Sequence, residues 1–165
     1  MGCREDEFER VAMPHARDLL RFALRLTHDS FSAEDLVQET LFLAWRGFRQ
    51  FESGTNARAW LFRILVNAHN AQKRKQRSSF PAEIPRAVFH SPLESLAVVE
   101  ALDRLTLDQR TVLLLAVIEG FTCREIANIL AIPMGTVMSR LGRARAAMCE
   151  MLSATSDRQC EKVAL

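Results

Sequence analysis

Glycine and proline are scarce in this chain of 165 residues, which has 6 Gly, 5 Pro and no Tyr. A sandwich or barrel of short strands needs frequent turns, so this composition disfavours an all-β fold and favours helices. The longest apolar run, Val112 to Ile118, is far too short to span a bilayer. Residues 1–7 lack the apolar core of a secretory signal. We therefore expect a cytoplasmic protein with no membrane insertion.

Motifs for metal binding and catalysis are also lacking. The cysteines form no C-x-x-C pair and have no histidine at zinc-ligand spacing; they are Cys3, Cys123, Cys149 and Cys160. Without a secretory context we expect reduced thiols, with Cys123 and Cys149 as small core or half-buried residues. No G-x-x-x-x-G-K, G-x-S-x-G or H-E-x-x-H motif occurs, and the four histidines are scattered. The sequence predicts no catalytic residue, no metal site, no cofactor and no enzyme.

Charge is distributed unevenly, although the net charge is only +2. Residues 58–77 hold six basic residues and no acid, and residues 135–149 hold three basic residues and no acid. Residues 29–39 hold four acids and no base. Two basic segments indicate polyanion contact at two places, and the acidic segment indicates a different partner. The alternative for each segment is a solvated helix face.

Apolar residues recur at three- and four-residue spacing along most of the chain, which predicts helices. A first helical stretch runs from Glu7 to Leu26 and breaks at Pro14. After a loop, a second helix begins with Ser32 as its N-cap and continues towards Arg49. A polar loop over residues 52–56 ends in Asn56, which can cap a third helix. Trp60 on that helix is expected in the core.

The stretch of residues 78–92 contains three of the five prolines and no helical period. We interpret it as a flexible linker between two domains. The predicted fold is therefore all-α, with two small helical domains at residues 1–77 and 93–155 and a C-terminal tail at residues 156–165.

The second domain has the features of a helix-turn-helix domain. After a helix over Leu93–Leu105, capping boxes at Thr106 and Thr122 open two further helices, and Gly120 ends the one between them. A turn at Ile132–Gly135 leads into a last helix whose Val137, Leu141, Ala144 and Met148 form a buried stripe. These parts match a helix-turn-helix unit, and a plain helical hairpin with a solvated arginine face remains the alternative.

The last helix presents polar residues on its opposite side and at its start. Arg140 and Arg143 could pair with guanine in a major groove, and Thr136 or Ser139 could reach bases or phosphates. Backbone N–H groups near Gly135 and Thr136 suit a phosphate. The basic helix of residues 57–77 differs, because a small polar loop precedes it and amides and cations line its far end. That mixture suits a strand with exposed bases.

Motifs in both halves occur together in a fixed order. In the N-terminal half these are Ala33–Thr40, Ala44–Arg46 and Phe51–Ile64. In the C-terminal half they are Gln109–Arg110, Glu119–Thr122, Glu125–Ala127, Ile132–Val137 and Ser139–Arg145. With these motifs nearly the whole chain resembles the extracytoplasmic-function (ECF) group of the sigma-70 family of bacterial RNA polymerase sigma factors.

The resemblance implies a promoter-specificity subunit that binds core RNA polymerase and directs initiation at −35 and −10 elements. Asp35, Gln38 and Glu39 match positions that dock on the clamp helices of the largest polymerase subunit. The loop that captures a base flipped from the non-template strand is matched by Ser53, Gly54, Thr55 and Asn56. Asn67 matches an amide that contacts the same −10 element. Phosphate contacts would come from Arg58, Lys73, Arg74 and Lys75. The recognition-helix positions that face −35 DNA are matched by Ser139, Arg140 and Arg143.

Other features qualify this reading. Met138 stands where many members of the family have Arg or Lys. The loop Phe51–Asn56 with Trp60–Asn67 is similar to a subgroup linked to thiol-oxidative stress and held by zinc-containing anti-sigma proteins, which implies an anti-sigma partner and a stress response. Two alternatives stay open: a response-regulator-type activator that binds DNA without polymerase, and a sigma-like adaptor that sequesters an anti-sigma factor without binding DNA.

Overall fold

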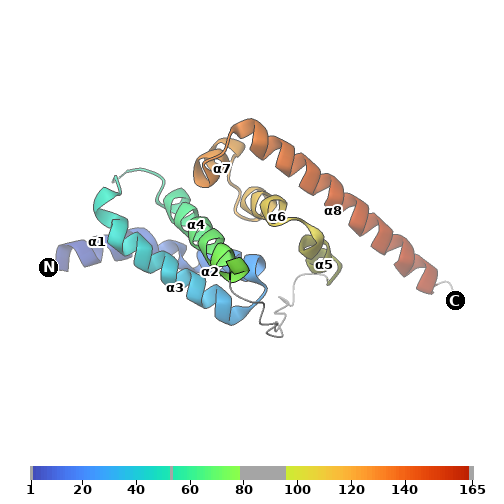
Figure 1. The fold of residues 1–165 in the computed structure, drawn as a ribbon, viewed down its shortest axis with the longest axis horizontal. Coiled ribbons are helices and arrows are strands. Elements are labelled where there is room, and N and C mark those ends of the chain that lie inside the picture. The colour runs from blue at the N-terminus through green and yellow to red at the C-terminus, as the bar shows by residue number, and fades with distance from the viewer. Residues whose placement is uncertain (1, 53, 79–95, 164–165) are drawn as a thin grey trace. The chain divides into compact units, whose positions relative to one another are not determined.

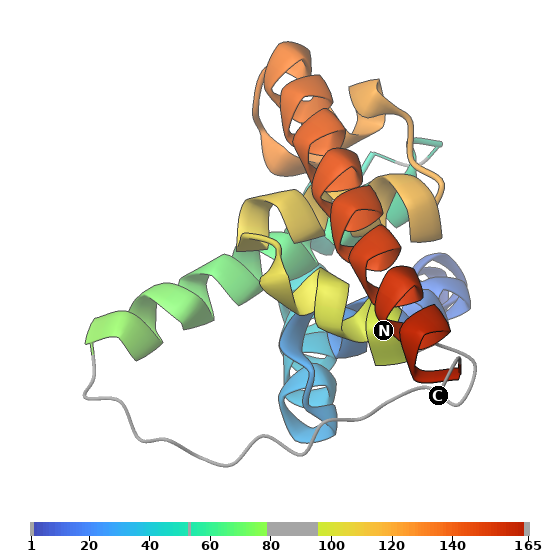
Figure 2. The same cartoon turned by 90° about the vertical axis from the view of Figure 1, so that its right-hand side faces the viewer.

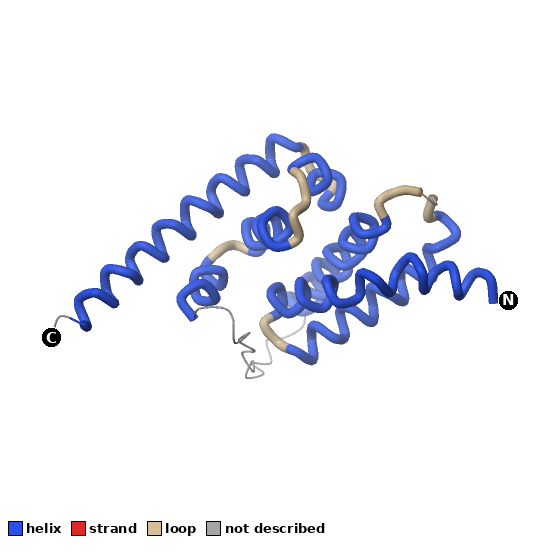
Figure 3. Tube along the Cα trace, turned by 180° about the vertical axis from the view of Figure 1, so that it is seen from behind, coloured by secondary structure: helices blue, strands red, loops and turns tan. Residues whose placement is uncertain are grey.

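The structure, a computed structural model, describes residues 2–52, 54–78 and 96–163, with side chains at 4–52, 54–76 and 97–153. Within these residues every element is a helix, and no strand occurs (Figure 3). None of the described helices is both long and apolar enough to cross a membrane. The predicted linker at residues 78–92 lies outside the described residues apart from Ser78, and so does Ser53.

The contacts divide the chain into two compact units, one with the helices up to residue 78 and one with most of residues 96–163. The first unit contains α1 (Gly2–Ala12), η1 (Met13–His15), α2 (Ala16–Thr27), α3 (Ser30–Gly47), η2 (Phe48–Gln50) and α4 (Ala57–Ser78). The second contains α5 (Leu96–Arg104), α6 (Leu107–Leu113), the π-helical η3 (Leu114–Ile118), α7 (Cys123–Leu130) and α8 (Met134–Val163). The prediction of two helical domains is confirmed, whereas their exact limits remain predictions.

The helices α2, α3 and α4 pack on one another to form the core of the first unit (Figure 1). Phe22 and Phe62 are fully buried and meet edge to face, with ring centroids 5.2 Å apart. Leu36 and Leu65 are also fully buried in this core. Burial of each such side chain contributes about 1.5–3 kcal/mol, so these apolar stripes fix which helix faces remain exposed.

At the helix ends of the first unit, two predictions from the sequence are confirmed and one is wrong. The break at Pro14 is confirmed, because η1 separates α1 from α2 there. The N-cap at Ser32 is wrong: Asp29 caps α3, and its Oδ2 accepts a hydrogen bond from the Ser32 N–H at 2.7 Å. The helix therefore starts at Ser30, three residues before Ala33, where a cap at Ser32 would have started it. Asn56 does cap α4, and its Oδ1 accepts from the Ala59 N–H at 3.0 Å.

In the second unit, α5 and α6 pack against the long helix α8 (Figure 2). The capping boxes at Thr106 and Thr122 are both complete, with each threonine accepting from the backbone three residues on. Gly120 has a φ of +69°, a left-handed conformation that favours glycine, and so ends the preceding helix as predicted. Cys123 is half-buried as expected, but Cys149 is exposed, so the prediction of a core or half-buried position is wrong for Cys149.

The core of the second unit follows the predicted pattern of α8. Val137 and Ala144 are fully buried and Leu141 is nearly so, whereas Met148, the fourth predicted member, is only half-buried. They share this core with Ile126 of α7 and Val112 of α6, which are also fully buried. Since the buried stripe runs along one side of α8, residues between its members are directed to the flanks or to solvent.

Candidate functional site

The exposed face of α3 carries the acidic and amide residues predicted to bind polymerase. Asp35, Gln38 and Glu39 are all exposed, at the spacing that places them on one side of the helix. The Gln72 Nε2 of α4 donates to Asp35 Oδ2 at 3.3 Å, which holds that carboxylate near the far end of α4. The structure thus brings the three predicted residues together on one surface.

An exposed aromatic residue extends this surface beyond the residues that the sequence analysis named. Phe42 follows Gln38 by four residues and Glu39 by three, and 53% of it is exposed. The Arg46 guanidinium carbon lies 5.6 Å from the centre of its ring. A large exposed aromatic side chain beside polar residues is typical of a protein interface. The spacing of Phe42 from Gln38 and Glu39 is a signal in the sequence that could have placed it on this face.

The described residues of the loop between η2 and α4 are held by hydrogen bonds of the loop's own polar groups. The Thr55 N–H and Oγ1 both donate to the Glu52 carbonyl, at 3.1 and 2.8 Å. Gly54 has a φ of +92°, and a Cβ built there would meet no atom within 4 Å. Because Asn56 uses Oδ1 to cap α4, two of the predicted base-reading side chains already serve the loop itself.

The predicted DNA-binding residues of α4 do not form one cluster. Arg58 is half-buried at the start of the helix, with Nε 3.7 Å from Asp18 Oδ2 and its guanidinium 5.1 Å from the Phe62 ring centre. Asn67 is exposed nine residues later, about 2.5 turns away, and so points to the opposite side of the helix. Arg74 follows Asn67 by seven residues, about two turns, and therefore lies on the same side of α4 as Asn67. Lys73 and Lys75 flank Arg74 in the sequence.

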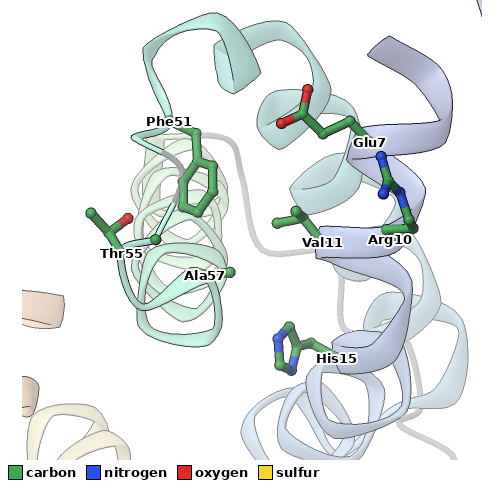
Figure 4. A pocket seen from close by; sticks show the side chains of 8 residues that line it. Glu7, Arg10, Val11, His15, Phe51, Thr55 and Ala57 are labelled. Carbon is green, nitrogen blue, oxygen red and sulfur yellow. The ribbon is translucent and has the colours of Figure 1, made fainter. Parts of the chain in front are cut away.

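A pocket of about 420 Å³ adjoins this loop in the first unit (Figure 4). One wall comes from α1 and η1 and includes Glu7, Val11 and His15, while Phe51, Gly54 and Thr55 line the other wall. Burial lowers the pKa of His15 below its ordinary value; the Arg58 charge lowers that pKa further, and Asp18 partly opposes both. The sequence analysis missed this wall, because nothing in the chain near Glu7 or His15 signals that a loop some forty residues away packs beside them.

On α8, the predicted recognition helix, only some of the residues predicted to contact DNA are exposed. Met138, Ser139 and Arg143 are exposed on its outer face. The Arg143 Nε donates to the Ser139 carbonyl at 3.3 Å and its Nη2 to Ser139 Oγ at 3.4 Å. The two predicted contacts are therefore coupled, since Arg143 in this position lies over Ser139.

Arg140 is directed to the flank of α8 rather than to the outer face. Its Nη2 lies 2.7 Å from Asp108 Oδ2 of α6, and 28% of the arginine side chain is exposed. At the start of the helix, the Thr136 N–H donates to the Pro133 carbonyl at 2.9 Å. That N–H is therefore already bonded within the turn, and the phosphate role predicted at Gly135 and Thr136 depends on the other groups there.

Comparison with known protein families gives matches in both units. Residues 11–79 match the family described as Sigma-70 region 2, and residues 95–148 match the family described as Sigma-70, region 4. The chain is 35% identical over 152 residues to the ECF RNA polymerase sigma factor EcfG of Rhodopseudomonas palustris, covering 86% of this chain and 81% of that protein. It is 36% identical over 138 residues to SigL of Mycobacterium tuberculosis, covering 77% and 78% respectively.

Solved structures give the same result for the fold. The sigma factor RpoE of Bartonella quintana, solved in complex with the anti-sigma factor NepR, matches with a TM-score of 0.77 at 34% identity. The match covers 89% of this chain and 97% of that one. CnrH, solved with the cytosolic domain of CnrY, matches with a TM-score of 0.69 at 25% identity, covering 91% and 90%.

Proposed function

Because the chain belongs to the ECF group of the sigma-70 family and is therefore a sigma factor, we propose which of its residues bind polymerase and which bind each promoter element. The first unit binds core polymerase through α3 and holds the melted −10 element. The second unit binds the −35 element with α8. One observation carries this proposal: region 2 and region 4 matches follow one another in a single chain, at residues 11–79 and 95–148.

Polymerase binding is assigned to the exposed face of α3. Asp35, Gln38 and Glu39 offer two carboxylates and an amide, which suit a basic and polar surface such as the clamp helices of the largest subunit. Phe42 adds an apolar anchor at the same face, where it is 53% exposed in the free chain. The acidic residues steer the encounter and the aromatic residue contributes buried area on docking.

The −10 element is assigned to the loop before α4 and to the outer side of that helix. The loop, with Ser53, Gly54, Thr55 and Asn56, holds one base extruded from the non-template strand. Asn67 contacts the neighbouring nucleotides, and phosphates are held along the helix by Arg58, Lys73, Arg74 and Lys75. Each phosphate contact adds about 0.7 to the slope of log affinity against log salt for a single strand.

The −35 element is assigned to the start and outer face of α8 in a major groove. Arg143 and Ser139 lie on the outer face and reach base edges, and Gly135 with Thr136 approaches a phosphate at the helix start. Arg140 reaches DNA from the flank of the helix after it leaves Asp108, from which it is 2.7 Å away in the free chain. No covalent chemistry is assigned to this protein, which acts in the cytoplasm where the polymerase is.

An anti-sigma factor is proposed as the regulator, in a stress response. Two solved structures match this chain over most of its length: the sigma factor RpoE with the anti-sigma factor NepR, and CnrH with the cytosolic domain of CnrY. A protein that covers α3 or α8 would block polymerase or promoter binding, so release of such a partner would switch the sigma factor on.

Transcription in vitro with core polymerase on a library of promoter sequences tests the proposal. We expect transcripts only when the chain is added, and the enriched templates should share two elements separated by a fixed spacer. Free chain without polymerase should bind these templates weakly. Tight and specific binding by the free chain would instead favour an activator, and a lack of transcripts together with capture of an anti-sigma protein would favour an adaptor.

A further inference from the structure

Two exposed methionines are neighbours near the start of α8. Met134 is 49% exposed and Met138 is 56% exposed, and their four-residue spacing places them next to each other on the helix surface. A single exposed apolar side chain is ordinary, but an adjacent pair on a helix assigned to DNA indicates a contact surface. Methionine is also flexible and polarizable, so it adapts to a surface of irregular shape. This pair is therefore a candidate for part of the interface of α8.

The methionine pair extends the outer face of α8 to one side. An α-helix turns by about 100° per residue, so Gly142 and Ser139 lie between Met138 and Arg143 around the helix. Gly142 and Ser139 are small and exposed, and a Cβ built on Gly142 would meet no atom within 4 Å. The backbone of α8 can therefore approach a partner closely along this middle line, with Met138 on one side of it and Arg143 on the other.

The charge around the methionines favours a polyanion. Residues 135–149 hold three basic residues and no acid. Arg145 is exposed and follows Met138 by seven residues, about two turns, so it lies on the same side of α8 as Met138. The major groove of DNA presents base edges between two rows of phosphates, and thymine adds a methyl group to that surface. The thioether chain can contact this methyl group while the arginine contacts a phosphate.

We propose that Met138 reads the 5-methyl group of a thymine in the −35 element, and that Met134 extends the same apolar contact. The inference rests on the proposed −35 role of α8. Ser139 and Arg143 act through hydrogen bonds, which a methyl group does not form, so Met138 adds a different kind of base recognition. Met138 and Arg143 are five residues apart, about 7.5 Å along the helix axis, and successive base pairs are about 3.4 Å apart. The thymine should therefore lie within about two base pairs of the base that Arg143 contacts.

The test uses holoenzyme reconstituted from the full chain and core polymerase, on a promoter taken from the library selection. Each thymine of the −35 element, on either strand, is replaced in turn by uracil, which removes the methyl group and keeps the base pair. Equilibrium binding is measured for wild type, Met138→Ala and Met138→Leu. Met13→Ala is the matched control, because Met13 is a methionine of similar exposure, 53%, in η1 of the first unit. Alanine and leucine are good helix formers, and circular dichroism checks that each variant folds.

We expect one thymine at which uracil weakens the binding of wild type and of Met13→Ala by about fourfold, the effect of burying one methyl group. This position should lie within about two base pairs of the one at which Arg143→Ala relaxes the base preference. Met138→Ala should bind the thymine and uracil templates equally, about as weakly as wild type binds the uracil template. Met138→Leu should keep part of the difference, because leucine retains an apolar side chain of similar size.

The proposal is overturned if uracil costs wild type nothing at any −35 position, or if Met138→Ala keeps the full uracil effect. It is also overturned if Met138→Ala weakens binding by the same factor on thymine and uracil templates, which would assign Met138 to a protein contact. A selected −35 element without an A·T pair would contradict it as well. If neither changes of the −35 sequence nor Arg143→Ala alter binding, the −35 role of α8 fails instead, and with it the premise of the methyl contact.

Discussion

Removal of the Asp108 carboxylate should strengthen −35 binding, although it removes an ion pair. In the free chain Arg140 Nη2 lies 2.7 Å from Asp108 Oδ2. If Arg140 contacts DNA, it must first give up this partner, and the carboxylate then remains near the DNA phosphates. Asp108→Asn keeps the shape of the side chain and removes the charge. The substitution therefore releases the arginine and reduces repulsion of the DNA.

The size of the effect follows from the exposure of the pair. The Asp108 side chain is 62% exposed and the Arg140 side chain 28%, so the pair is worth about 0.2–1 kcal/mol. Release of that energy on binding corresponds to a gain of about 1.4- to 5-fold in affinity. Asp108 also lies in the first turn of α6, where its negative charge interacts favourably with the positive end of the helix dipole. Stability should therefore fall by about 0.5–2 kcal/mol while DNA affinity rises.

Equilibrium binding of holoenzyme to a fluorescent promoter duplex measures the effect at several salt concentrations. Arg140→Ala and the double variant complete a cycle, in which the Asp108→Asn gain should vanish without Arg140. Asp103→Asn is a matched control, because Asp103 forms a similar pair with Arg110, 3.4 Å away, elsewhere in the unit. A loss of affinity in Asp108→Asn that depends on Arg140 would show that Asp108 positions the arginine for DNA. An unchanged affinity would show that Arg140 does not reach DNA.

Other substitutions test the remaining assignments. Arg143→Ala should weaken −35 binding by about 1–3 kcal/mol, and an unchanged footprint would exclude it as a base contact. Asp35→Arg with Glu39→Arg should abolish co-purification with core polymerase while circular dichroism is unchanged; Glu34→Arg is the control, and normal co-purification of the double variant would contradict the docking role. His15 has a lowered pKa in the folded state, so the unfolded chain binds more protons below pH 6.5 and stability falls as pH drops through that range. His15→Gln should remove this part of the pH dependence in denaturant melts, and an identical slope in both proteins would refute the assignment.

Short-range signals predicted most of the fold. The capping boxes at Thr106 and Thr122 depend on contacts three residues apart, so the sequence contains everything that decides them. The error at Ser32 has a local cause as well. His28 adopts a left-handed conformation, and the Thr27 hydroxyl donates to the Asp29 carbonyl at 3.0 Å. These contacts make the turn short and give the cap to Asp29, although either residue type is a good N-cap.

Features that depend on distant contacts could not be predicted. The π-helical segment Leu114–Ile118 lies within a run that is apolar on all sides, so periodicity cannot show where the hydrogen bonds shift. The pairing of Arg140 with Asp108 joins residues of two helices, and it moves a predicted outer-face contact to the flank. The pocket wall at Glu7 and His15 depends on how α1 packs beside the loop. In each case the residue types were visible in the sequence, but their neighbours were not.

The net charge of this chain is only +2, and carboxylates lie beside two of the arginines that we assign to DNA. Arg58 and Arg140, which we assign to DNA, lie near acids of neighbouring helices, at 3.7 Å from Asp18 and 2.7 Å from Asp108. The Arg140–Asp108 pair is weak because its carboxylate is 62% exposed, so exchange of that carboxylate for a phosphate costs little once DNA is held in place. Before that, however, the carboxylates reduce the attraction of the free chain for DNA within the screening distance of about 8–10 Å. Promoter binding should therefore depend on polymerase to bring the two units to their DNA elements, because the field of the free chain is too weak to do so.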